Sequence, residues 1–205
     1  MNPTRLYLLR HGEVEASYQR VFGGRIDMEL SPHGHAQAAA LAKFLERVAF
    51  DAIYASPMKR VQQTLAPLAG QYLRKPILLP DLREMDFGVW TGLKWSEVQE
   101  RHGVSAYQWL EQLDKGTVPE AESATQTRAR VEPCLRRILA ESHGKTVAVV
   151  CHGGIVRTLL ALLLDLPIVK TAAFEIDYAS LTVVDHRPDK VELQLLNLTP
   201  WRDHL

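Results

Sequence analysis

Short apolar segments alternate with helix-forming segments along most of the chain, and this alternation most constrains the fold. The segments at residues 6–9, 52–55, 77–79 and 146–150 are three to five residues long, which suits buried strands rather than helices. Strands that alternate with helices favour a parallel sheet with helices packed on both faces. The sequence therefore predicts an α/β fold.

Several helix signals stand between these strands. Serine–proline pairs at 31–32 and 56–57 each offer an N-cap followed by a proline that suits the first helical turn. A further helical pattern covers 123–142. Residues 153–164 form an apolar segment with a helical period that is hydrophobic on nearly every face, which predicts a buried helix.

The remaining segments complete the predicted architecture. The tail alternates apolar and other residues around a Pro-Asp turn at 188–189, which predicts two or three strands that include an antiparallel hairpin. Residues 86–121 are rich in Trp, Gly and polar residues, and we expect a helical lid there. The prediction is one domain over 1–205, a three-layer α/β/α sandwich around a mostly parallel, mixed sheet.

Charge and cysteine content narrow the function classes. The chain has 24 Lys plus Arg and 24 Asp plus Glu, so its formal net charge is zero, which argues against nucleic acid or an anionic membrane as the main partner. Its two cysteines, Cys134 and Cys151, make no disulfide scaffold and lack the spacing of a metal site. No long apolar leader opens the sequence, and the apolar segment 155–166 is too short to span a bilayer. We expect a cytoplasmic protein.

Chemically active side chains follow each of the four predicted strands. Arg10 and His11 come directly after the first strand, and Arg60 lies just beyond the second. Glu84 follows the third strand, and His152 follows the fourth. Because ligands bind outside the carboxyl ends of the strands in such folds, we expect these five side chains to meet in one site.

This set of side chains suits phosphoryl transfer. The guanidinium groups of Arg10 and Arg60 can bind the charged oxygens of a phosphoryl group bidentately. A neutral imidazole at His11 is a competent nucleophile, and His152 can donate to the same oxygens. Glu84 is the available acid for the leaving oxygen. Either histidine alone would more often be a structural core residue, but both at strand ends beside arginines favour a site.

Glycines accompany these side chains. Gly12, Gly153 and Gly154 let backbone N–H groups approach a phosphate with no Cβ in the way. The amides of Gly153 and Gly154 also open the predicted buried helix, whose dipole favours an anion. The histidines at 33 and 35 have no partner cluster, so we predict no metal site.

The sequence resembles a known family in its motifs. The run Arg10-His11-Gly12-Glu13 after the first strand is similar to the signature of the histidine phosphatase superfamily, which includes the cofactor-dependent phosphoglycerate mutases. Later landmarks agree in order and spacing, and the resemblance covers about residues 4–198. These landmarks are Phe22-Gly23-Gly24, Ser56-Pro57 with Arg60 and Thr64, Leu82-Arg83-Glu84, Glu122-Ser123 with Arg130, and His152-Gly153-Gly154.

The resemblance implies a role for each matched residue. His11 would be the phosphorylated nucleophile, Glu84 the proton donor, and Arg10, Arg60 and His152 the phosphate pocket. It also implies hydrolysis of a small phosphorylated metabolite without a metal or organic cofactor. Ser17 stands where the family often has asparagine. Substrate contact and loop geometry both stay open for the remaining candidates, which are Ser17, Gly23 and Gly24.

The segment after Glu84 bears on which reaction is catalysed. Similar mutases carry an Arg-His-Tyr-Gly run there, whereas residues 85–90 read Met-Asp-Phe-Gly-Val-Trp and resemble the branch of broad-specificity and α-ribazole phosphate phosphatases. This favours a phosphatase over a mutase. A non-catalytic phosphate-binding module is a third interpretation, disfavoured because nucleophile and acid are both present. A homodimer through the apolar terminal strands stays open.

Overall fold

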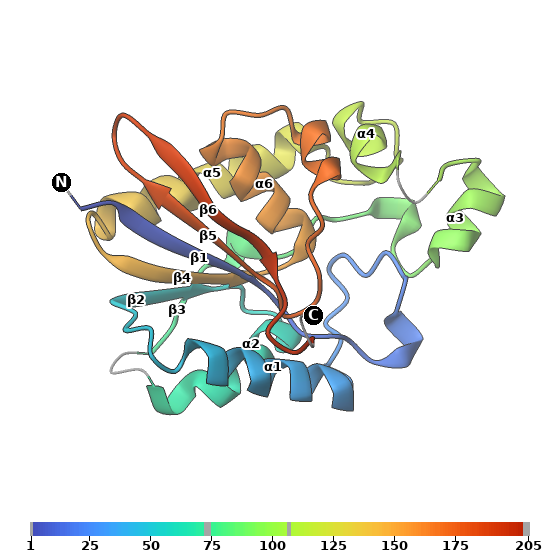
Figure 1. Ribbon diagram of the computed structural model, residues 1–205. Helices are drawn as coiled ribbons and strands as arrows, with labels where there is room; N and C mark the ends of the chain where they lie inside the picture. Colours follow the sequence, from blue (N-terminus) through green and yellow to red (C-terminus); the bar gives the residue numbers. More distant parts are fainter. Residues whose placement is uncertain (1, 72–74, 106–107, 203–205) are drawn as a thin grey trace.

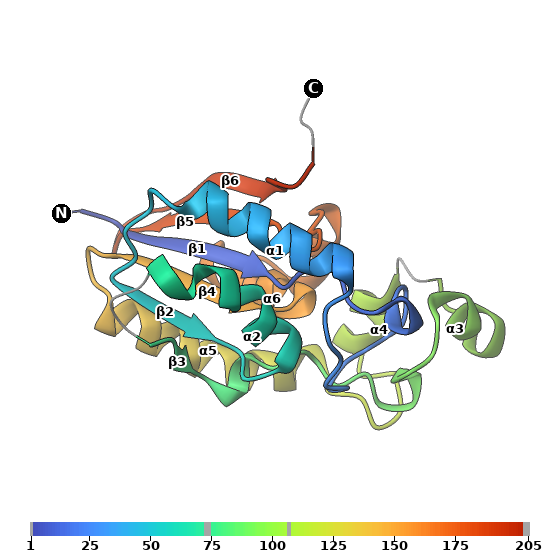
Figure 2. The same ribbon diagram turned by 90° about the horizontal axis from the view of Figure 1, so that it is seen from below.

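A computed structural model, which describes residues 2–71, 75–105 and 108–202, contains one six-stranded sheet with helices on both faces (Figures 1 and 2). The strand order is β3-β2-β4-β1-β5-β6. The first four strands in this order run parallel, whereas β5 is antiparallel to β1 and β6 is antiparallel to β5. The strands are β1 (Thr4–Arg10), β2 (Ala52–Ala55), β3 (Ile77–Leu78), β4 (Thr146–Cys151), β5 (Leu181–His186) and β6 (Val191–Leu198).

Two pairs of helices cover the sheet, and two more lie beyond its edge. Helices α1 and α2 pack on one face, and α5 and α6 on the other (Figure 1). Helices α3 and α4 lie beyond the carboxyl ends of β1 and β2 (Figure 2). The helices are α1 (Pro32–Leu45), α2 (Lys59–Leu65), α3 (Trp95–His102), α4 (Trp109–Asp114), α5 (Ala124–Glu141) and α6 (Gly153–Leu163).

The buried core has one part on each face of the sheet. Leu6 and Leu8 of β1 point toward α5 and α6, whereas Leu9 points toward α1 and α2. Successive side chains of a strand face opposite ways, so a strand covered on both faces must be apolar throughout. The strand segments of the sequence are continuously apolar because helices cover both faces of the sheet. The predicted three-layer α/β/α sandwich is confirmed.

The tail holds two of the two or three expected strands, and one expected helix cap needs correction. Residues 174–178 form no strand; they lead from a 3-10 helix, Ile168–Ala173, into β5. Ser56 does not cap the second helix, because α2 begins at Lys59 with Met58 at its N-cap. After α2 ends at Leu65, the chain continues as a 3-10 helix, Ala66–Gln71, which contains Pro67.

The predicted lid is attached to the rest of the fold at both ends. An isolated bridge pairs Phe87 with Ala121 at its base, and another pairs Lys94 with Val21 in the loop after β1. Its aromatic side chains pack with Phe22: the ring centroids of Phe22 and Phe87 are 5.1 Å apart. No helix among residues 2–71, 75–105 and 108–202 is long and apolar enough to cross a membrane. The cytoplasmic location stays a prediction.

The N-terminus of α1 packs directly against the loop that follows β1. A Cβ on Gly34 would lie 2.0 Å from the carbonyl oxygen of Glu13, and a Cβ on Gly12 would lie 2.6 Å from the carbonyl oxygen of Gly34. Neither backbone contact can relax through a flexible side chain. The two glycines therefore set how closely α1 approaches the segment that carries His11.

We expect Gly34→Ala to destabilise the protein by about 1–3 kcal/mol, because the added methyl group overpacks backbone against backbone. Thermal unfolding measures the effect as a lower Tm. The matched control is His35→Ala, an exposed position in the same helical turn, which should change stability by less than about 0.5 kcal/mol. Equal stability of Gly34→Ala and the wild type would contradict this account.

Candidate active site

A cavity of about 490 Å³ lies at the carboxyl edge of the sheet. Parallel pairing brings the ends of β1 and β4 together, with Arg10 beside Cys151, and places Ala55 of β2 beside Val150. Arg10, His11, Arg60 and Glu84 therefore all line one cavity. His152 lies behind it, fully buried, with its ring centroid 5.2 Å from that of His11.

The hydrogen bonds of His11 define its tautomer. Its Nδ1 atom lies 2.8 Å from the carbonyl oxygen of Gly12, which can only accept, so Nδ1 carries the proton. Nε2 is then an acceptor, and the Nε–H of Arg60 donates to it at 3.2 Å. His11 thus holds its Nε2 lone pair at the cavity, as a nucleophilic imidazole requires.

Arg60 is the buried centre of the site, with a relative exposure of 2%. Its Nε–H also reaches Nδ1 of His152 at 3.2 Å. The Nη1 and Nη2 groups donate to the carbonyl oxygens of Ile26 and Gly24 at 2.8 and 3.0 Å. Burial lowers the pKa of Arg60 to about 10, so the group is still cationic at neutral pH.

His152 is fixed between Arg60 and Ser56. Because its Nδ1 accepts from Arg60, Nε2 carries the proton and donates to Oγ of Ser56 at 2.9 Å. In this tautomer the N–H of His152 points away from the cavity, whereas the sequence predicted donation to a phosphate. Such donation requires Nδ1 to be protonated. In the geometry shown, His152 holds Arg60 in place.

Both histidines stay neutral in the folded protein. Burial lowers the pKa of His11 well below its ordinary value, and the neighbouring charges of Arg60 and Arg10 lower it further. Burial and Arg60 lower the pKa of His152 in the same way. A neutral His11 keeps the lone pair that attack on phosphorus needs.

Arg10 is only partly satisfied by the protein. Its Nη1 donates to the carbonyl oxygen of Ile176 at 2.6 Å, and its guanidinium carbon lies 4.0 Å from the ring centroid of Tyr178. Its Nε–H is buried and has no hydrogen-bond partner in the described parts of the chain. A buried donor without an acceptor is costly, so this group favours an anion in the cavity.

Glu84 is held at the first turn of α6. One carboxylate oxygen accepts from the backbone N–H of Gly154 at 3.1 Å, and the other accepts from that of Met85 at 2.9 Å. A Cβ on Gly154 would lie 2.5 Å from Oε1 of Glu84. Gly154 is therefore needed for the close approach of Glu84, and its N–H binds the acid rather than a phosphate.

The other predicted glycines have different surroundings. Gly153, Gly23 and Gly24 all line the cavity. The N–H of Gly12, however, donates to Oγ1 of Thr64 at 3.0 Å, so this amide is already occupied. The glycine at this position allows the approach of α1 instead, as its contact with Gly34 shows.

Ser17 is not brought to the cavity. It lies in a short 3-10 helix, Ala16–Tyr18, with an exposed side chain, and the neighbouring Tyr18 and Gln19 line the cavity instead. A phosphate contact for Ser17 stays a prediction that this geometry does not favour.

Several cavity residues were not singled out from the sequence. Arg157 of α6 lines the cavity and donates through Nη1 to the carbonyl oxygen of Thr171. Glu175, Asp177 and Tyr178 precede β5. Because β5 runs antiparallel to β1, with Leu181 beside Leu9, the segment before β5 lies at the same edge as the end of β1. The predicted hairpin concerned only the pairing of β5 with β6, so the sequence contained no signal for these residues.

The cavity brings together as many cations as carboxylates. Four guanidinium groups and four carboxylates line it: Arg10, Arg20, Arg60 and Arg157, with Glu13, Glu84, Glu175 and Asp177. Arg60, the most buried of the eight, lies beside the neutral imidazole of His11. In the described ranges, no group of three or more His, Cys, Asp or Glu side chains is placed to hold a metal ion. The fold and the residues that line the cavity are those of an enzyme that acts on phosphate groups.

Comparison with known proteins places this enzyme in a family. Residues 6–199 match the sequence profile of the histidine phosphatase superfamily (branch 1), and the chain belongs to that superfamily. This confirms the resemblance found in the motifs. Several relatives are named phosphatases, and this chain is a phosphatase of the same superfamily, a phosphoric monoester hydrolase.

Individual relatives cover nearly the whole chain. Phosphoserine phosphatase 1 of Hydrogenobacter thermophilus is 31% identical over 95% of this chain and 92% of its own length. Adenosylcobalamin/alpha-ribazole phosphatase of Escherichia coli is 26% identical over 94% of this chain and 95% of its own. Among solved structures, a mycobacterial glucosyl-3-phosphoglycerate phosphatase superposes with a TM-score of 0.85, at 26% identity over 96% of this chain and 99% of that one.

We expect His11 and His152 to remain neutral in the free enzyme at pH 6.5, where an ordinary histidine is half protonated, because burial and adjacent arginines hold both pKa values below the ordinary 6.5. Proton-detected ¹⁵N spectra of histidine-labelled protein measure this, with the urea-unfolded protein as control.

The same shifts fix the sign of the stability change. Below about pH 6.5 the histidines of the unfolded chain bind protons, whereas His11 and His152 of the folded chain do not. The free energy of unfolding therefore falls as the pH drops through that value, and the full contribution of the two histidines is present above it. A free enzyme in which either ring titrates at or above 6.5 would show that the site does not exclude imidazolium.

Proposed function

We propose that this protein hydrolyses a small phosphate monoester through a covalent phosphohistidine at His11, with Glu84 as the proton donor. The observation that carries the proposal is the Nε2 lone pair of a neutral, buried His11, held between the two guanidinium groups of Arg10 and Arg60. A nucleophile beside two cations is the arrangement that transfer of a dianionic phosphoryl group needs.

In the first step the Nε2 lone pair of His11 forms a bond to phosphorus as the bond from phosphorus to the ester oxygen breaks. Glu84, in its acid form, gives its proton to that oxygen, and the alcohol leaves. In the free enzyme the Nε–H of Arg60 donates a hydrogen bond to Nε2 of His11. Once Nε2 is bonded to phosphorus, this N–H donates to a phosphoryl oxygen instead. The unpaired Nε–H of Arg10 binds a second phosphoryl oxygen.

In the second step the Glu84 carboxylate accepts a proton from water, and the water oxygen bonds to phosphorus as the nitrogen–phosphorus bond breaks. Inorganic phosphate is released, and His11 returns to its neutral form with its Nδ1–H still donating to the Gly12 carbonyl oxygen. One carboxyl group thus serves as acid and then as base, and no further group is required.

The charge of the cavity favours hydrolysis over mutase chemistry. A mutase must retain a bisphosphate intermediate, which carries two strongly charged groups, and must keep water from the phosphohistidine. Here the carboxylates of Glu13, Glu84, Glu175 and Asp177 line the cavity together with four guanidinium groups and offset their charge. This balance suits one phosphate and disfavours a second.

The alcohol part of the substrate is small and polar on this proposal. Relatives bear names that include phosphoserine, alpha-ribazole and glucosyl-3-phosphoglycerate phosphatase, all of which denote alkyl phosphates. A panel of phosphoserine, α-ribazole phosphate and 3-phosphoglycerate therefore tests this enzyme, with isomerisation of phosphoglycerate followed in parallel to detect mutase activity.

We expect wild-type protein quenched during turnover of ³²P-labelled substrate to carry acid-labile label at His11, and His11→Ala to carry none and release no phosphate. Removing the nucleophile removes the covalent route altogether. His33→Ala, on an exposed first turn of α1, is the control and should label as wild type. Phosphate release with no trapped intermediate would exclude the covalent mechanism. Isomerisation without release would replace the phosphatase by a mutase.

We expect Glu84→Gln to lower kcat/KM for alkyl phosphates by roughly 10²–10⁴-fold, the usual contribution of general acid catalysis. With p-nitrophenyl phosphate, whose phenolate leaves without a proton, phosphohistidine formation should fall far less. The comparison uses the pre-steady-state burst of nitrophenolate, which reports the first step alone. Equal losses with both kinds of leaving group would show that Glu84 is not the proton donor.

A further inference from the structure

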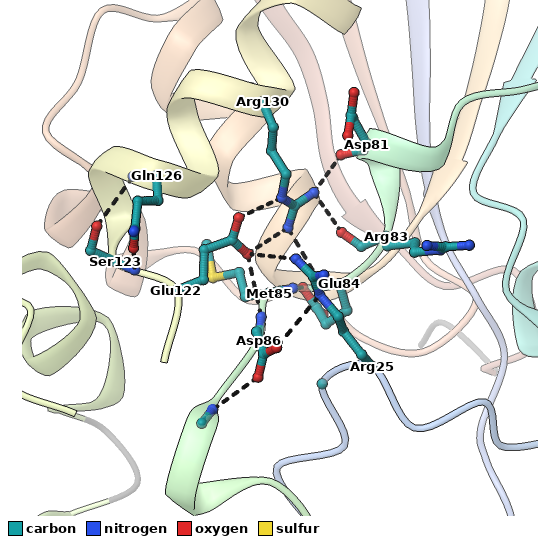
Figure 3. Close-up of polar contacts among 12 residues, drawn as sticks. Arg25, Asp81, Arg83, Glu84, Met85, Asp86, Glu122, Ser123, Gln126 and Arg130 are labelled. Carbon is teal, nitrogen blue, oxygen red and sulfur yellow. Dashed lines mark hydrogen bonds and ion pairs between the residues drawn. The ribbon is translucent and has the colours of Figure 1, made fainter. Parts of the chain in front are cut away.

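One guanidinium outside the cavity organises the segment that carries Glu84. Arg130 lies on α5 and is not a cavity residue, yet its side chain is only 15% exposed. Figure 3 shows it between the carboxylate of Glu122 and a row of backbone carbonyls. The sequence placed Arg130 among the family landmarks but gave it no role.

The contacts of Arg130 use nearly every donor of its guanidinium. Nε and Nη2 bind the two carboxylate oxygens of Glu122 at 2.6 and 2.8 Å. Nη1 donates to the carbonyl oxygen of Arg83 at 2.9 Å and to that of Asp81, and Nη2 donates to that of Glu84 at 3.3 Å. One side chain therefore binds the carbonyl groups of both peptide units that flank the Glu84 Cα. It also binds a carbonyl of the turn before them.

Glu122 holds the other end of the same segment. Its Oε2 accepts from the backbone N–H of Asp86 at 3.3 Å, and its own N–H donates to the carbonyl of Asp86 at 2.9 Å. Arg25 adds longer ion pairs, at 3.6 Å to Glu122 and 3.8 Å to Asp86. Glu84 thus lies between a clamp on residues 81–84 and a clamp on Asp86 (Figure 3).

This support matters because residues 83–86 are neither helix nor strand. Backbone groups of such a segment need partners from outside, and side chains supply them here. The carboxyl of Glu84 is three rotatable bonds from a backbone that Arg130 and Glu122 fix. A displacement of about 1 Å in a reacting group can cost roughly 10²-fold in rate.

We infer that the Arg130–Glu122 pair is a positioning pair for the acid, holding the carboxyl of Glu84 at the first turn of α6 where the leaving oxygen must lie. The inference rests on the proposed function, in which Glu84 is the proton donor. Neither residue lines the cavity, so the pair acts on the acid through the segment that carries Glu84. Arg25, more exposed and with longer contacts, contributes less.

The test compares Arg130→Gln with Arg128→Gln. Arg128 lies on the same helix, is 54% exposed and pairs with Glu132 across one helical turn, so the same substitution there is a matched control. We expect Arg130→Gln to lower kcat/KM roughly 10–100-fold for the fastest alkyl phosphate of the panel. The nitrophenolate burst should change less than about 3-fold, because departure of that phenolate needs no proton. Arg128→Gln should leave both unchanged.

A double-mutant cycle with Glu84→Gln separates positioning from a general structural role. If Arg130 acts through the acid, Arg130→Gln has little further effect once Glu84 is glutamine. Loss of folded protein would lower the rates with both substrates by the same factor. The burst amplitude measures the concentration of folded active sites and so detects such a loss. Should Arg130→Gln fold poorly, Glu122→Gln keeps the shape of the side chain but only one of its two acceptor oxygens, and it should show the same leaving-group dependence.

The outcomes distinguish this inference from the proposed function. Equal losses with both leaving groups, or additivity with Glu84→Gln, would overturn the positioning role while the acid assignment stands. If Glu84→Gln itself shows no leaving-group dependence, the acid assignment fails and the positioning role fails with it. The inference is supported if both single variants show the dependence on the leaving group and the effects of Arg130→Gln and Glu84→Gln do not add in the double variant.

Discussion

The guanidinium of Arg60 lies out of water between two imidazoles and two backbone carbonyls, and the geometry of the site depends on this placement. Its single Nε–H is shared by Nε2 of His11 and Nδ1 of His152, which makes both atoms acceptors and so sets both tautomers. Its Nη groups bind the loop that contains Gly24 and Ile26. A buried cation is stable only with such partners, so the loop and the histidines are fixed by the same requirement.

The charge distribution leaves the free site electrostatically incomplete. Arg10 and Arg60 lie close enough for each charge to disfavour its buried neighbours, and both histidines respond by remaining neutral. The carboxylate of Glu84 offsets part of the charge, but the Nε–H of Arg10 is left without an acceptor in the described chain. A phosphoryl dianion supplies what is missing, and it does so beside an imidazole that has kept its lone pair. The charges of Arg10 and Arg60 therefore both attract the phosphoryl group and keep the imidazole of His11 in its nucleophilic, neutral form.

The sequence was sufficient to predict the sheet and the meeting of the five main site residues. Buried parallel strands are continuous apolar segments, and chain direction alone brings their carboxyl ends together, so Arg10, Arg60 and His152 could be placed without any contact information. The antiparallel tail was also readable, although residues 174–178 lead into β5 rather than forming a strand.

Hydrogen-bond partners could not be predicted, because they depend on atomic distances. Gly12 was expected to offer its N–H to a phosphate, yet Thr64, one turn into α2, already accepts it. Ser56 was expected to cap a helix and instead accepts from His152. Ser17 lies one residue away from the cavity lining, a displacement smaller than the precision of any pattern. Sequence spacing indicates which residues meet, not which donor faces which acceptor.

The lid contacts both halves of the catalytic apparatus, and this limits how it can vary. Near its start, the backbone of Phe22 exchanges hydrogen bonds with Gly92 and Leu93, next to the loop that binds Arg60. At its base, Phe87 pairs with Ala121, next to the hydrogen-bonded residues Asp86 and Glu122. A change of lid shape therefore reaches the phosphate pocket through one attachment and the acid through the other. Helices α3 and α4 lie between the attachments, so they can change with the substrate while the two attachments keep nucleophile and acid in register.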